Sequence, residues 1–364
     1  MQPPSPSATV LPMRAIGPGL CLILSLFGCS SEHPAATTAP TPTGPPHALV
    51  SQERLMKDLA ALPKGRAVRG TQVEQEGLVT TETLILHRLT ELGYQPELQP
   101  LTWNLKYQAD YEAKAGVPQS RPPAGPLADN TWHNIIVDLP GLDLPQEVLV
   151  VGAHFDAVPG TPGADDNGTG TAALLELARV LKAHPTRRTI RLAFFNLEEV
   201  GLKGSTQYVR TSRRKDEIVI GMVSLEMLGF YSDAPGSQRS PLPRIDGVFE
   251  PPTVGDFIGL GTISSYSKFC RRLDEEMRTA APGLKTVVAD FLPIPPPDFL
   301  RSDHAPFMLA GIPAVLLTDT SNFRNPNYHR ASDTVETIDA ARFALVVRGV
   351  AGAAYAIAEP PAQK

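Results

Sequence analysis

Short, continuous apolar runs alternate along the chain with longer stretches in which apolar residues recur at helical spacing. The apolar runs predict buried strands at residues 148–151, 189–195, 218–225, 287–289 and 314–318. The helical spacing predicts helices at about 168–183, 203–213, 264–279 and 339–357. Strands that alternate with helices are typical of an α/β domain. We therefore expect a three-layer fold with a mixed, mostly parallel central sheet and helices on both faces.

The N-terminal region has a different pattern. Arg14 is followed by an apolar stretch, residues 15–27, which is too short and too interrupted by Gly and Pro to span a bilayer. The stretch ends in Leu26-Phe27-Gly28-Cys29, which resembles a bacterial lipobox, in which the Cys is acylated. We expect residues 1–28 to be a lipoprotein signal peptide and Cys29 to be the lipidation site. The chain would then be exported and anchored to a membrane by its lipid, facing the periplasm or the cell surface. An ordinary secretory signal, giving a secreted protein, is the alternative.

The residues after this signal are numerous enough for one large domain or two small ones. Residues 29–47 are rich in Ser, Thr, Ala and Pro and predict an extended linker. The domain is expected over residues 48–358, with a tail at 359–364 and with Pro-rich surface loops at 234–252 and 291–299, near the rim of a site.

Charge and cysteine content restrict the partners and the source of stability. The net charge is −5, and no run of Lys and Arg suggests a nucleic-acid partner. Cys270 would be the one cysteine of the mature domain, so no internal disulfide is expected, and a buried packing role is predicted for it.

Polar residues that can bind metal follow three of the predicted strands. His154 and Asp156 come directly after the first, Glu198 and Glu199 after the second, and Glu226 ends the third. Because the carboxyl ends of parallel strands meet at one edge of a sheet, we expect these side chains to lie close together. Each of these residues also has an ordinary structural explanation, such as a surface hydrogen bond or an acidic first helical turn.

Two further segments supply more donors. Asp165 and Asp166 lie in GADDNGTG, residues 163–170, where a helix N-cap is the alternative and a calcium loop lacks its distant Glu. His329, next to Tyr328, follows the last predicted strand and could be an ordinary loop histidine. Mixed His and carboxylate donors suit zinc, and cobalt or manganese can substitute. The HExxH zinc helix is absent from the sequence.

Residues 148–170, 191–204, 224–229, 302–318 and 327–338 resemble the zinc aminopeptidase family that includes secreted bacterial leucyl aminopeptidases and glutamate carboxypeptidase II. The shared motifs are His-x-Asp, Asp-Asp-Asn-Gly, Glu-Glu-x-Gly-x-x-Gly-Ser, Ser-Asp-His and a late Tyr-His. The resemblance implies an exopeptidase, most simply an aminopeptidase, that hydrolyses the N-terminal residues of peptides. It implies no oligomeric state.

The resemblance also implies a metal role for five residues. His154 and Glu226 would hold one zinc ion, Glu199 and His329 the other, and Asp166 would bridge the two. Many family members carry Asp where this chain has Glu226. The extra methylene moves that carboxylate, so two ions are expected and a single ion is the alternative.

The remaining motif residues would act around the ions. Glu198 matches the family's general base toward a water that the ions acidify, Asp156 would support the first histidine, and Tyr328 would stabilise the oxyanion. The residues expected in a supporting shell are Asp165, Asp303 and His304.

Other activities of the same fold stay open at this point. A carboxypeptidase or dipeptidase would recognise a free carboxylate through arginines, and Arg301, Arg324 and Arg330 lie near the motifs. A glutaminyl cyclase would use one zinc ion for ring closure, and a binding module would use none.

Overall fold

The computed structural model of the chain describes residues 44–103, 131–211 and 216–359. The predicted signal peptide, the lipidation site Cys29 and most of the predicted linker lie outside the described residues, as do residues 360–364 of the predicted tail. Pro46–Leu49 forms a short 3-10 helix in which Pro46 is buried. This helix begins two residues before the predicted domain boundary at residue 48.

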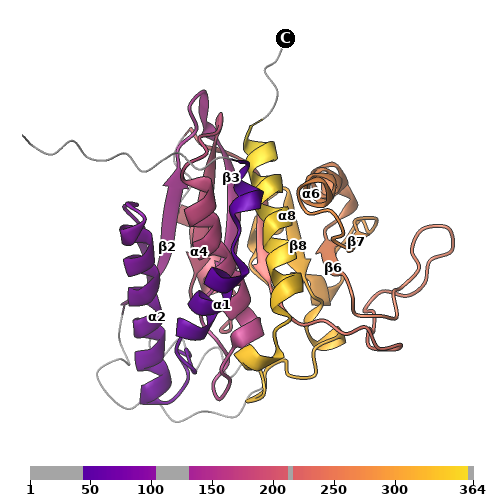
Figure 1. The fold of residues 1–364 in the computed structure, drawn as a ribbon, viewed down its shortest axis with the longest axis horizontal. Helices are drawn as coiled ribbons and strands as arrows, with labels where there is room; N and C mark the ends of the chain where they lie inside the picture. The colour runs from indigo at the N-terminus through magenta and orange to yellow at the C-terminus, as the bar shows by residue number, and fades with distance from the viewer. Residues whose placement is uncertain (1–43, 104–130, 212–215, 360–364) are drawn as a thin grey trace, which may run out of the picture. The chain divides into compact units, whose positions relative to one another are not determined.

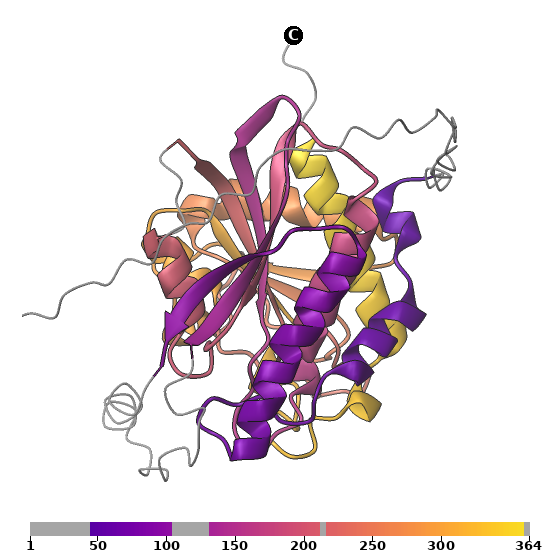
Figure 2. The same cartoon turned by 90° about the vertical axis from the view of Figure 1, so that its left-hand side faces the viewer.

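An eight-stranded mixed sheet forms the centre of the domain (Figures 1 and 2). Its strands in chain order are β1 (Glu97–Thr102), β2 (Thr131–Leu139), β3 (Leu144–His154), β4 (Arg188–Phe195), β5 (Ile218–Glu226), β6 (Ile258–Gly261), β7 (Thr286–Ala289) and β8 (Ala314–Thr318). Across the sheet the order is β1-β2-β4-β3-β5-β8-β6-β7. The four middle strands are parallel to one another, whereas β2 and β6 join them in antiparallel pairs. The predicted mixed, mostly parallel sheet is confirmed.

Helices cover both faces of this sheet, as Figures 1 and 2 show. The larger apolar core includes residues of α1 (Gln52–Ala61), α2 (Gln72–Glu91), α4 (Gly170–Leu181), α6 (Ser267–Ala280) and α8 (Ala340–Ala358). The smaller core, on the other face, includes residues of α5 (Lys203–Thr211) and α7 (His304–Leu309). By length and composition α8 could cross a membrane, but most of it is buried inside the domain, as expected of a core helix.

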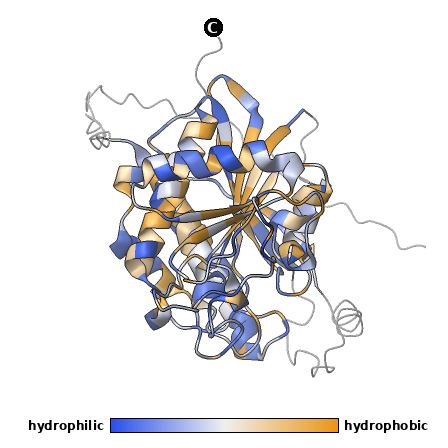
Figure 3. Ribbon diagram, turned by 90° about the vertical axis from the view of Figure 1, so that its right-hand side faces the viewer, coloured by the Kyte–Doolittle hydropathy of each residue, from blue (hydrophilic) through white to orange (hydrophobic). Residues whose placement is uncertain are grey.

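The middle strands are apolar on both sides because both of their faces are covered. In β3, Leu149 and Val151 belong to the larger core, and Val148 and Val150 belong to the smaller one. Successive side chains of a strand point to opposite faces, so a strand covered on both sides needs a continuous apolar run. Figure 3 shows these hydrophobic strands inside the more hydrophilic helices and loops around them. Cys270 of α6 is fully buried in the larger core, in agreement with the packing role predicted for it.

Six elements were not predicted from the sequence: α1, α2, β1, β2, β6 and α7. Helix α2 begins with a capping box in which Thr71 and Glu74 bond each other's backbone, a local sequence signal for a helix start. Strand β1 contains Pro100, which is tolerated because β1 lies at the edge of the sheet. Strand β6 has four residues, two of them Gly, so its pattern is too short to recognise.

Candidate metal centre

Five of the predicted site residues converge at the carboxyl edge of the parallel strands. His154 is the last residue of β3, and Glu226 is the last residue of β5. Glu199 follows the end of β4, and His329 lies in the loop after β8. Asp166 lies in the irregular turn Ala164–Thr169 directly before α4. The sheet topology therefore brings together residues that are up to 175 positions apart (329 − 154 = 175).

Asp166 lies between the two histidines. Its Oδ1 atom is 3.4 Å from Nε2 of His154, and its Oδ2 atom is 3.1 Å from Nε2 of His329. Oε2 of Glu226 is 3.4 Å from Nε2 of His154, and Oε2 of Glu199 is 3.5 Å from Nε2 of His329. The five side chains thus form two sets that share Asp166, with one histidine and one glutamate in each.

These spacings fit zinc. Ligand atoms that lie about 2.0–2.1 Å from a tetrahedral zinc ion are about 3.3 Å from one another. The four nitrogen–oxygen separations above range from 3.1 to 3.5 Å. Candidate ligand atoms of His154, Asp166 and Glu199 also lie within 4.8 Å of one another, as do those of His154, Glu198 and Glu226. The donor set and its spacing are therefore compatible with two zinc ions flanking Asp166.

The electrostatics of the site favour a bound cation. Burial raises the pKa values of Glu198 and Glu199 well above their ordinary range, and neighbouring carboxylates raise them further. Burial would also raise the pKa of Asp166, but hydrogen bonds with His154 and His329 bring it below its usual value. Several acids are thus held close together in a dry environment. A divalent cation would offset their mutual repulsion.

Asp156 contacts residues of both ligand sets. Its carboxylate oxygens accept hydrogen bonds from the backbone N–H groups of Glu198 and Glu199, at 3.0 and 3.2 Å. Nδ1 of His154 lies 3.1 Å from the carbonyl oxygen of Asp156 and 3.5 Å from its Oδ1 atom. One buried carboxylate therefore fixes the turn that carries both glutamates and lies beside the imidazole of His154.

Asp165, although adjacent to Asp166, points into a different set of contacts. Its Oδ1 atom accepts a hydrogen bond from the backbone N–H of Gly229 at 2.9 Å, and its Oδ2 atom accepts one from Nδ2 of Asn325 at 2.7 Å. Burial and the nearby Asp319 carboxylate raise the pKa of Asp165. Asp165 therefore bonds the loops around the centre, whereas Asp166 is the aspartate that lies between the two histidines.

The Ser302-Asp303-His304 segment lies at the start of α7, behind Glu226. Ser302 donates a hydrogen bond from Oγ to Oε2 of Glu226 at 2.7 Å. Asp303 is fully buried, and burial raises its pKa to about 7, with Glu226 raising it further and the charge of His154 opposing the shift. His304 is also fully buried, and burial lowers its pKa to about 4, so its imidazole is neutral at neutral pH.

Tyr328 is half-buried, with its ring stacked on that of His329 at a centroid distance of 3.7 Å. Nη2 of Arg301 donates a hydrogen bond to the phenol oxygen at 2.7 Å. A guanidinium group can only donate, so the phenol oxygen is the acceptor here. The phenol proton is therefore free to point toward another acceptor.

The backbone is strained at three positions of the centre. His329 itself has a φ of 57°, Leu197, which precedes Glu198, has a φ of 60°, and Met227, which follows Glu226, has a φ of 51°. Left-handed conformations cost of order 1–3 kcal/mol at non-glycine residues and persist where surrounding contacts hold them. Such contacts exist here, since Asn167 accepts a hydrogen bond from the backbone N–H of Met227 at 3.2 Å.

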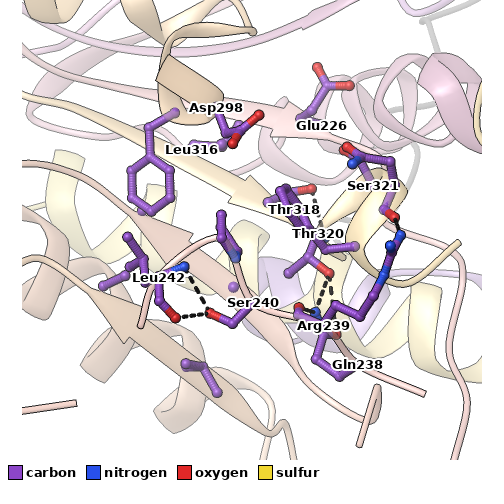
Figure 4. A pocket seen from close by; sticks show the side chains of 18 of the residues that line it. Glu226, Gln238, Arg239, Ser240, Leu242, Asp298, Leu316, Thr318, Thr320 and Ser321 are labelled. Carbon is purple, nitrogen blue, oxygen red and sulfur yellow. Dashed lines mark hydrogen bonds between the residues drawn. The ribbon is translucent and has the colours of Figure 1, made fainter. Parts of the chain in front are cut away.

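An apolar pocket of about 120 Å³ opens beside the centre. Figure 4 shows the Glu226 carboxylate at one side of this pocket, with Leu242, Ser240 and Gln238 on the opposite side. Its apolar lining consists mainly of Leu242, Phe249, Phe257, Leu260, Phe299 and Leu316. Both Pro-rich segments predicted as loops near the site contribute to this lining.

Two residues of this region were not predicted as part of the site. Asp333 accepts hydrogen bonds from the backbone N–H groups of Asp165 and Asp166, at 2.9 and 3.1 Å. Arg66 bonds the loop that precedes Asp166. The backbone partners named here are 96 to 168 positions away, so no sequence spacing could be recognised.

The sequence model of peptidase family M28 matches residues 134–354, which is more than half of the chain. The chain belongs to peptidase family M28. The protein YfbL of Escherichia coli is 32% identical over 242 residues, 62% of this chain and 71% of that protein. "Probable lipoprotein aminopeptidase LpqL" of Mycobacterium tuberculosis is 32% identical over 234 residues, 58% of this chain and 42% of that protein.

Solved structures share the fold of this chain. The zinc aminopeptidase BSAP of Bacillus subtilis superposes with a TM-score of 0.62 at 20% identity, over 86% of this chain and 97% of that one. A glutaminyl cyclase of Bacteroides thetaiotaomicron superposes with a TM-score of 0.56 at 14% identity, over 84% and 98% of the two chains. At these identities the likeness shows the shared fold.

The family membership confirms the predicted peptidase class. The relative LpqL is named as a probable aminopeptidase, and BSAP as a zinc aminopeptidase. The role of each site residue and the number of ions stay predictions. So do replacement by cobalt or manganese and the lipid anchor.

Proposed function

We propose that this M28 member removes N-terminal residues with bulky apolar side chains from peptides, using two zinc ions held by His154, Asp166, Glu199, Glu226 and His329. The observation that carries the proposal is the pair of ligand sets that share Asp166, at the mouth of an apolar pocket. The pocket volume of about 120 Å³ is of the order that accepts a benzene-sized group. A Leu or Phe side chain would therefore fit there.

Removal of residues from the amino end is favoured by the charges around the centre. Carboxylates dominate the site, and they attract a free ammonium group. Of the arginines near the motifs, Arg324 is buried and donates to the carbonyl oxygens of Phe230 and Phe257 and to Gln238. Arg301 already bonds Tyr328 and Asp298. Arg301 and Arg324 therefore do not form a free pair for a peptide's carboxylate.

The residues of the chain divide the work of hydrolysis. When bound, zinc ions polarise a peptide carbonyl and lower the pKa of a water toward about 7. Glu198, whose burial raises its pKa, takes the proton of the attacking water and passes it to the leaving amine. Tyr328, whose oxygen accepts from Arg301, directs its phenol proton to the carbonyl oxygen as negative charge develops there.

The N-terminal region supports an activity outside the cytoplasm. The lipobox-like sequence at Cys29 supports an exported lipoprotein, and so does the name of the relative LpqL, a probable lipoprotein aminopeptidase. Metabolic labelling with a palmitate analogue should label the native chain. The Cys29→Ala variant should carry no label and should no longer be recovered with the membranes. Equal labelling of the two would remove Cys29 from this role.

A panel of aminoacyl reporter substrates tests the activity itself. Purified chain with bound zinc should hydrolyse Leu and Phe substrates faster than Ala, Glu or Lys substrates, and a chelator should abolish the reaction. N-acetyl-Leu reporters should stay intact, since they lack the free amine. Cleavage of the acetylated substrate, release of C-terminal residues, or ring closure of a Gln-peptide without hydrolysis would overturn the proposal.

A further inference from the structure

Arg66 is a buried arginine outside every motif and outside the residues that match the family model. It lies in the connection between α1 and α2, and only 1% of its surface is exposed. Its guanidinium group donates four hydrogen bonds, all to backbone carbonyl oxygens. The acceptors are Phe155 at 2.9 Å, Pro63 at 3.0 Å, Pro162 at 2.8 Å and Gly163 at 2.8 Å.

Three of those carbonyls belong to the loop at residues 155–163, which joins His154 to the turn that carries Asp166. The guanidinium therefore contacts both ends of this loop. The carbonyl oxygen of Arg66 also accepts a hydrogen bond from the backbone N–H of Ala157, at 2.8 Å. A further contact comes from Glu74 of α2, which accepts from the N–H of Gly160 at 2.6 Å. A segment far away in sequence thus fixes the distance between two of the predicted ligands.

Carboxylates near Arg66 compensate the cost of burying its positive charge. A buried cation costs several kcal/mol unless it is compensated. Burial lowers the pKa of Arg66, and four carboxylates oppose that effect, those of Asp333, Asp156, Asp166 and Glu199. All four belong to the metal centre or bond its backbone. These four carboxylates therefore compensate the buried positive charge of Arg66.

We propose that Arg66 is a positioning residue of the metal centre, which holds the loop 155–163 so that His154 and Asp166 stay at the spacing of zinc ligands. The inference rests on the proposed zinc site. Arginine is required because its planar group offers five donors in a fixed fork, whereas lysine offers three donors on one atom. Lysine at this position keeps the charge but cannot reach all the carbonyls that Arg66 bonds.

Charge and geometry make opposite predictions for zinc affinity. If Arg66 acted mainly through its charge, its removal would strengthen zinc binding, because a nearby cation repels the ions. If it acts by holding the loop, both a charged and a neutral replacement weaken binding. Outer partners of metal ligands change metal affinity by about 10–100-fold when they are replaced.

The test measures zinc affinity by competition with a chelator, in wild type, Arg66→Lys and Arg66→Gln. We expect about 10–100-fold weaker zinc binding in both variants. The matched control is Arg179→Met, which removes an arginine that bonds Leu49 and Glu176 away from the centre. This control should lose thermal stability but keep its zinc affinity. Unchanged affinity in Arg66→Lys, or tighter binding in Arg66→Gln, would overturn the inference.

Hydrogen exchange provides a second readout that does not depend on zinc. The amides of Ala157 and Thr161, both bonded within this region, should exchange faster in zinc-free Arg66→Lys than in zinc-free wild type. The control should match wild type. Equal exchange of these amides in wild type, Arg66→Lys and Arg179→Met would contradict the positioning role. Failure of wild type to bind zinc would instead refute the proposed function, so the two failures are distinguishable.

Discussion

The hydroxyl of Ser302 donates a hydrogen bond to Oε2 of Glu226 over 2.7 Å, and both side chains are buried. The same Oε2 atom lies 3.4 Å from Nε2 of His154. Glu226 is one methylene longer than the aspartate that many family members carry. Ser302 therefore fixes the carboxylate of the longer side chain at the spacing of a zinc ligand.

Replacing Ser302 by Ala should weaken one of the two zinc sites. The variant loses the donor behind Glu226, and we expect about 10–100-fold lower zinc affinity for that site. Calorimetric titration of the zinc-free chain measures both affinities. Ser224→Ala is the matched control, because Ser224 contacts Ser302 at 3.2 Å and does not bond Glu226. Two unchanged affinities in Ser302→Ala would refute this role.

Replacing Glu198 by Gln should separate turnover from metal binding. The amide cannot take up a proton, so kcat should fall by about 10²–10⁴-fold. The ligand atoms stay in place, so elemental analysis should find the zinc content of wild type. Near-normal turnover would remove Glu198 from the role of general base.

Replacing Gly261 by Val should change the preferred substrate. A Cβ atom at Gly261 would lie 3.2 Å from the ring of Phe299, and both residues line the pocket. The smaller pocket should lower kcat/KM for Leu and Phe substrates far more than for Ala substrates. An equal loss for large and small side chains would argue that the pocket does not hold the N-terminal side chain.

The zinc-free chain should lose stability as the pH rises. Burial raises the pKa of Asp303 from 3.8 to about 7. Because the folded-state pKa is above the unfolded one, the stability from this group is fully present below about pH 4 and is lost as the pH rises through about 7. Thermal unfolding from pH 4 to pH 8 measures the loss.

Asp303→Asn is the variant that isolates this effect. Its carboxamide cannot ionise, so its melting temperature should fall less between pH 4 and pH 8 than that of wild type. Burial raises the pKa values of Asp319 and Asp333 to about 6 and about 7, so the variant should keep part of the dependence. Identical slopes in the two chains would contradict the assignment.

The sequence was most informative where one local pattern decides the structure. Strands β3, β4 and β5 are apolar throughout because both of their faces are covered, and the polar residues at their ends were recognisable for that reason. The fold class and the family followed from these segments. Edge strand β1, with Pro100, and the short β6 form through pairing with distant partners, which no local pattern records.

The supporting contacts of the centre were harder to predict. Asp333 and Arg66 bond backbone atoms, so their roles depend on where the chain passes and not on the residue type of the partner. The pocket likewise combines two loops with β6 and β8, and its shape exists only in the folded chain. Ser302 belonged to a recognised motif, but its bond to Glu226 required the structure.

Anomalous diffraction at the zinc absorption edge, from crystals of the chain purified without chelator, tests the central claim most directly. Two peaks are predicted, one between His154 and Glu226 and the other between His329 and Glu199, both beside the carboxylate of Asp166. A single peak, or peaks away from these five side chains, would contradict the two-zinc centre.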